Sequence, residues 1–74
     1  MDKYTQAHDI IAKNIKGAIK ERGLKSKYVA SKLGWNEMAL SSLLNGRKTI
    51  KSEYMPYIAN AIGCDLSELF EGVL

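Results

Sequence analysis

The sequence VASKLGWNEMALSSLLNG, residues 29–46, contains the pattern that decides the fold. It places two short amphipathic segments on either side of LGWN, a four-residue connection around Gly34. Gly34 is suited to end the first segment in a left-handed conformation, and Asn36 is a good N-cap for the second. The stretch therefore predicts helices over about 26–33 and 36–45, joined by a tight turn.

Helical periodicity continues outward on both sides of this stretch. Apolar residues recur at helical spacing between residues 5 and 22, which predicts an amphipathic first helix that Gly23 ends. After a basic loop, Ser52 is the expected cap of a fourth helix that runs to Ile62. Pro56 is then in the first turn of this helix, where its ring meets no fully helical carbonyl.

The last predicted helix begins at Asp65, because Asp65 and Glu68 have the spacing of a capping box. Its apolar residues either fill the core or pair with a second copy of the chain; they are Leu66, Leu69 and Phe70, followed in the tail by Val73 and Leu74. No segment shows the alternation of a β-strand. The sequence therefore predicts an all-α fold with five helices.

Length and composition narrow the class of protein. The 74 residues are enough for one small core and too few for two domains. A single cysteine, Cys64, cannot form an internal disulfide, and no second cysteine or nearby histidine suggests a metal site. Neither a signal peptide nor a membrane span is apparent, and no set of catalytic groups or phosphate-cradling glycine loop occurs. We expect a cytoplasmic, non-enzymatic protein without cofactor, metal or small-molecule ligand.

Charge is distributed unevenly along the chain. Residues 13–51 hold ten basic side chains and two acidic ones, a net charge of +8, whereas the remaining residues carry a net charge of −5. Such a division orients a molecule toward a polyanion. The alternative is a solvated face of an ordinary helical protein.

The order of these elements resembles the Cro/CI-type (XRE) helix-turn-helix family of phage and bacterial regulators. The resemblance extends from Ile11 to Phe70, and four motifs carry it: RGL at 22–24, VASKLG at 29–34, LLNGRK at 43–48 and IANAIGCDLSELF at 58–70. It implies a compact lambda-repressor-like DNA-binding domain over 11–70. Residues 1–10 are then an N-terminal extension running into the first helix, and residues 71–74 are a short C-terminal tail.

The resemblance also implies which residues contact DNA. In this family the second helix of the motif enters the major groove, so the implied base-reading residues are Asn36, Glu37, Met38, Ser41 and Ser42. The implied phosphate-binding residues begin the preceding helix and follow the reading helix; they are Lys25, Ser26, Lys27, Asn45, Arg47 and Lys48. The reading helix contains no Arg or Lys for guanine, so we expect affinity to come mainly from the flanking basic residues.

Two departures from the family pattern are informative. Many members carry an Arg late in the first helix and a Glu before the Asn-Gly pair, whereas here these positions hold Ile19 and Leu44. Joint replacement of an ion pair by an apolar pair is compatible with the fold. The other departure is Lys25, which stands where a Ser or Thr cap is usual and predicts a weaker or shifted cap.

The resemblance implies a sequence-specific, double-stranded DNA-binding transcriptional regulator, a repressor by expectation. We expect a homodimer, because one reading helix covers too few bases to specify an operator. The alternative is a protein-binding module, such as an antitoxin or repressor modulator, that uses the region of Trp35, Met38 and Leu44. Trp35 itself is expected to pack on Leu40 as a hydrophobic staple.

Overall fold

The computed structural model describes the backbone of residues 3–73 and the side chains of residues 7–73. Its elements are α1 (Lys3–Glu21), α2 (Ser26–Leu33), α3 (Glu37–Leu44), the 3₁₀ turn η1 (Ser52–Tyr54), α4 (Met55–Ile62) and α5 (Leu66–Leu69). No strand occurs within the described range. The predicted all-α, five-helix fold is therefore confirmed.

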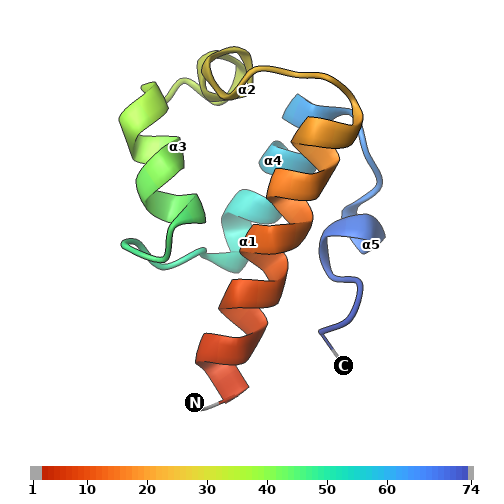
Figure 1. The fold of residues 1–74 in the computed structure, drawn as a ribbon. Coiled ribbons are helices and arrows are strands. Elements are labelled where there is room, and N and C mark those ends of the chain that lie inside the picture. The colour runs from red at the N-terminus through yellow and green to blue at the C-terminus, as the bar shows by residue number, and fades with distance from the viewer. Residues whose placement is uncertain (1–2, 74) are drawn as a thin grey trace.

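Helix α1 runs through the middle of the molecule and separates α3 from α5 (Figure 1). It packs against both, while α2 packs against α3 and α4. The side chains buried most completely come from every α-helix; they are Ile15, Val29, Leu40, Met55, Ile58 and Leu69. One continuous core thus holds α3 on one side of α1 and α5 on the other.

The positions that depart from the family pattern lie in this core. Ile19 and Leu44 are both buried and belong to the same apolar cluster. An uncompensated charge at either position would be costly to bury, because no water would solvate it. The apolar replacement of both residues is thus consistent with the packing.

The turn that joins α2 to α3 follows the rules of helix ends. Gly34 has a φ of 75° and ends α2 in the left-handed region, as predicted. Asn36 caps α3, since its side-chain Oδ1 accepts a hydrogen bond of 2.8 Å from the backbone N–H of Ala39. Lys25 is the N-cap residue of α2 and makes no side-chain capping bond, so the predicted weakness of this cap is confirmed.

One predicted helix start and one predicted capping bond are wrong, whereas Asp65 is the N-cap residue of α5 as predicted. Ser52 begins η1 rather than α4, and α4 begins at Met55 with Pro56 in its first turn. Pro56 has no N–H to bond the carbonyl of Ser52, which favours a tighter turn before the helix proper. At α5, Asp65 makes no side-chain capping bond. The expected capping box is absent, and the carboxylate of Glu68 instead lies 3.4 Å from the guanidinium of Arg22.

Candidate nucleic-acid interface

Helix α3 presents one apolar and one polar face. Leu40, Leu43 and Leu44 are buried against the core. The predicted base-reading residues lie on the outer side: Asn36, Glu37, Met38 and Ser41 are exposed, and Ser42 is half-buried. Met38 has 80% of its surface exposed. The geometry therefore leaves this face of α3 accessible to a large partner.

The side-chain oxygen of Asn36 already accepts a hydrogen bond within the protein. This oxygen, Oδ1, caps α3 through the N–H of Ala39. A bidentate contact with adenine requires both the carbonyl oxygen and the amide N–H₂ of an asparagine. The cap occupies one lone pair of Oδ1 and fixes its direction, which restricts the bidentate contact that Asn36 could make with adenine.

The end of α3 is tied to its surroundings by Asn45. The Nδ2 of Asn45 donates a hydrogen bond of 3.2 Å to the Oγ of Ser41. Its Oδ1 accepts one of 3.3 Å from the Nζ of Lys16 on α1. All three side chains are exposed.

The predicted phosphate-binding residues lie at the start of α2 and in the loop after α3. Lys25, Ser26 and Lys27 are exposed at the start of α2, which packs beside α3, and Arg47 and Lys48 are exposed in the loop that leaves α3. Among the described residues, none of these four cations takes part in an ion pair. Their charge is therefore available to a partner.

The beginning of α2 offers backbone donors as well as charge. A helix leaves its first N–H groups without intrahelical acceptors. Lys25 supplies no side-chain acceptor for them, unlike Asn36 in α3. An anion held there would bond these N–H groups and meet the positive end of the helix dipole. The missing cap at Lys25 thus has a physical consequence, because these N–H groups receive no side-chain acceptor from the N-cap residue.

Two residues of α1 hold the basic loop and were not among the predicted site residues. His8 makes a hydrogen bond of 2.9 Å through Nε2 with the backbone carbonyl oxygen of Lys48. Lys16 reaches Asn45 at the other end of the same loop. His8 and Lys48 are 40 positions apart, so no local sequence pattern indicates this contact.

Other chemistry is sparse in the described part of the chain. Residues 3–73 contain no group of three or more His, Cys, Asp or Glu side chains arranged to hold a metal ion. No helix in that range has the length and apolar character needed to cross a membrane. Burial raises the pKa of the Cys64 thiol, and the nearby carboxylate of Glu68 raises it further. Cys64 is thus less reactive than an ordinary thiol.

Comparison with known proteins agrees with this geometry. A family model described as helix-turn-helix matches residues 15–69, which is more than half of the chain. The matched segment begins within α1, includes α2 and α3 and ends with α5. No curated protein and no solved structure gives a significant match.

Proposed function

Because the chain belongs to the Cro/CI-type helix-turn-helix family of DNA-binding regulators, we propose that it is a transcriptional repressor that recognises a defined sequence of double-stranded DNA. The observation that carries this proposal is that the cations before α2 and after α3 form no ion pair among the described residues, while the outer face of α3 is exposed. Such an arrangement suits a helix that lies in the major groove while cations from the neighbouring segments contact the phosphates and hold it there. The site of action would be the cytoplasm.

The phosphate contacts are proposed to supply most of the affinity. One group of contacts comes from Lys25, Ser26, Lys27 and the N–H groups that begin α2. The other comes from the loop after α3, through Asn45, Arg47 and Lys48. Each neutralised phosphate releases counterions from the duplex, so binding becomes steeply dependent on salt.

The exposed face of α3 is proposed to supply a modest specificity. Glu37 can accept a hydrogen bond from cytosine N4, and Met38 can contact a thymine methyl group. The hydroxyl groups of Ser41 and Ser42 can form hydrogen bonds with several different bases, and the amide group of Asn36 can donate a hydrogen bond to a base. None of these side chains makes the bidentate contact with guanine that Arg provides, which is worth about 1–3 kcal/mol of discrimination.

A homodimer would compensate for this short reading surface. Leu66 is 42% exposed and Phe70 is 39% exposed, one turn apart around α5. Val73, in the tail, is half-buried. They belong to α5 and the tail after it, and α5 lies on the side of α1 away from α3 (Figure 1). Pairing two copies through these residues would leave both reading helices free for the half-sites of a palindrome.

The proposal is tested by the salt dependence of binding to a nonspecific duplex. We expect the affinity of the wild-type protein to fall steeply between low and moderate salt. In the variant Arg47→Glu/Lys48→Glu, the slope of log K against log salt should decrease by about 2, one unit for each lost phosphate contact. The matched control Asp65→Lys/Glu71→Lys changes charge beside α5 and should leave DNA binding at or above the wild-type level.

Salt-independent binding, or binding unaffected by reversal at Arg47 and Lys48, would contradict the proposal. It would favour the alternative of a protein-binding module, such as an antitoxin or repressor modulator. One observation already weakens the expected form of that alternative: Leu44 is buried and cannot contact a partner. Selection of bound sequences from a random duplex pool would then test specificity, since a dimer should yield a palindrome.

A further inference from the structure

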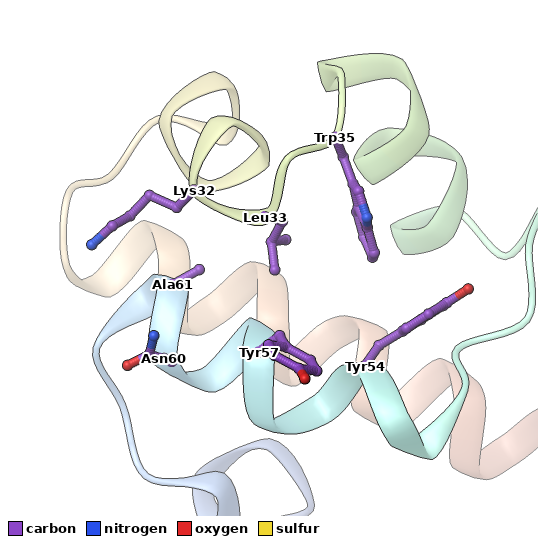
Figure 2. A pocket seen from close by; sticks show the side chains of 7 residues that line it. All are labelled: Lys32, Leu33, Trp35, Tyr54, Tyr57, Asn60 and Ala61. Atoms are coloured by element: carbon purple, nitrogen blue, oxygen red, sulfur yellow. The ribbon is translucent and has the colours of Figure 1, made fainter.

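A groove on the molecule is not used by the proposed DNA contacts. It lies between the α2–α3 turn and α4 and has a volume of about 370 Å³. Figure 2 shows the rings of Trp35 and Tyr54 pointing toward one another at one end and Tyr57 rising from α4 beside them. Leu33 and Ala61 add aliphatic surface from the two facing helices. The groove is therefore lined largely by apolar and aromatic groups.

The aromatic side chains in this groove are only partly covered by the fold. Trp35 and Tyr54 meet edge to face with ring centroids 5.3 Å apart, and both are half-buried. Tyr57 is 70% exposed. Single exposed apolar residues are normal on protein surfaces, whereas several aromatic rings converging on one hollow are typical of an interface. Such rings are the side chains that most often dominate binding energy.

The charges beside the groove restrict the chemistry of its occupant. Lys32 is one of its lining residues, and none of the lining residues is acidic. At the other end, the Nζ of Lys51 lies 5.9 Å from the centroid of the Tyr54 ring. An occupant therefore meets an apolar centre with a lysine near either end, the Nζ of Lys32 lying 5.4 Å from the centroid of the Tyr28 ring on α2. Electrostatic complementarity favours an apolar group flanked by carboxylates.

We propose that this groove binds an acidic peptide segment of a separate protein, with an aromatic or large aliphatic side chain inserted beside Trp35 and Tyr57. A DNA duplex offers negative charge but no apolar side chain to fill the hollow. The proposal goes beyond DNA binding and does not depend on it. Trp35 also connects Gly34 to Asn36, so the peptide would contact the turn that orients α3.

Trp35 provides the measurement, because it is the only tryptophan in the chain. Its fluorescence is followed while acetylated peptides containing one phenylalanine flanked by glutamates are added. Matched peptides carry lysine in place of glutamate, or alanine in place of phenylalanine. We expect the glutamate–phenylalanine peptide to change the Trp35 emission saturably and both matched peptides to bind at least tenfold more weakly.

Variants of the groove make the test specific. Tyr57→Ala should weaken peptide binding about tenfold, the loss expected for an aromatic residue central to an interface. Tyr57→Phe keeps the ring and should bind like the wild type. Lys32→Glu should weaken binding several-fold, whereas Lys20→Glu makes the same charge change on α1 and should have little effect. Because Tyr57 is largely exposed, its removal should leave the melting temperature close to that of the wild type.

Four results would overturn the proposal. Equal binding of the lysine-flanked and glutamate-flanked peptides would remove the role of charge, and absence of binding at millimolar peptide would remove the site. Equally tight binding of free N-acetylphenylalanine would assign the groove to a small aromatic acid. Self-association that Tyr57→Ala abolishes would assign it to a second copy of the chain, whose segment 65–73 is itself acidic and apolar. The salt dependence of DNA binding is measured separately, so its failure would leave these results unchanged.

Discussion

The two sides of α1 differ in what their charged groups do. Around the helix-turn-helix, at the start of α2 and after α3, Lys25, Lys27, Arg47 and Lys48 have no ion-pair partner among the described residues. On the α5 side, Arg22 is paired with Glu68 across 46 positions of sequence. The four cations can therefore interact with a partner, whereas the charges of Arg22 and Glu68 connect α1 to α5 within the chain.

The apolar groups show the opposite arrangement. The inner face of α3 is buried, and the one large hydrophobic residue of this helix that is exposed is Met38. In the four-residue helix α5 only Leu69 is fully buried, while Leu66 and the following Phe70 remain exposed. A fold of this size buries only about 60% of the surface of its unfolded chain. From this comparison we propose that the α3 side binds a polyanion and that the α5 side binds an apolar partner.

Phe70→Asp tests the α5 half of this comparison and should have the largest effect. If α5 pairs two copies, a carboxylate in the apolar contact should dissociate the dimer and weaken binding to a palindromic duplex about thirtyfold or more, as expected for a loss of at least 2 kcal/mol at an interface centre. Sedimentation and DNA titration measure the two effects. Leu66→Asp, on the same surface, serves as a second variant, and thermal melting checks that both remain folded. Unchanged sedimentation in both variants would remove the α5 dimer.

Lys25→Ser sharpens the contrast between charge kept for a partner and charge used for the fold. Serine can cap α2, so we expect the free energy of unfolding to rise by about 0.5–1 kcal/mol. DNA binding should weaken, with a salt slope smaller by about 0.9, because one phosphate contact is lost. Chemical denaturation and salt titration give the two values. Lys20→Ser, on α1, is the matched control. A gain in both stability and DNA affinity would mean that Lys25 does not contact phosphate.

The sequence was sufficient to predict features that depend on near neighbours. Gly34 and Asn36 mark the ends of α2 and α3 through their own backbone and side-chain preferences, and both predictions are confirmed. The start of α4 was wrong because the missing N–H of Pro56 favours a tighter turn ahead of the helix. The candidate DNA contacts remain predictions, although the structure leaves most of those side chains exposed.

Features that depend on distant residues could not be predicted in this way. Glu68 has the spacing of a capping residue, but Arg22 provides a different partner for its carboxylate. His8 is in contact with the loop at Lys48 only because the fold brings α1 beside that loop. In both cases the side chain contacts a residue that is distant in the sequence, and local sequence spacing does not identify such a partner.

His8→Ala tests whether α1 helps to position the basic loop. Loss of its hydrogen bond to the carbonyl of Lys48 should weaken binding to nonspecific DNA about threefold, corresponding to roughly 0.7 kcal/mol, within the usual range for one such bond. His8→Gln retains an N–H donor and should recover most of the affinity, which separates positioning from any charge on the histidine. Fluorescence anisotropy with a labelled duplex measures both variants. Equal affinities for alanine, glutamine and wild type would show that the loop holds its position without this bond.

The smallest expected effect is a change in the reactivity of Cys64, which reports the electrostatics of the α5 side. Burial raises the pKa of its thiol, and Glu68 and Asp65 raise it further, while Arg22 lowers it. Because only the thiolate is alkylated, the rate with iodoacetamide should rise at higher pH in the folded protein than in the denatured chain. Glu68→Gln removes one raising charge and releases Arg22 from its ion pair, so both changes should move that rise to lower pH. Arg22→Gln should move it to higher pH, and since Cys64 is the only cysteine, no other thiol contributes.

A raised pKa in the folded state also means that the folded protein holds this proton more tightly. Stability should therefore decline slightly as the pH rises above the thiol pKa of the unfolded chain. If Glu68→Gln instead moved the alkylation profile to higher pH, the carboxylate would not be acting on Cys64 through its charge, and the α5 side would lack the electrostatic coupling that distinguishes it from the α3 side.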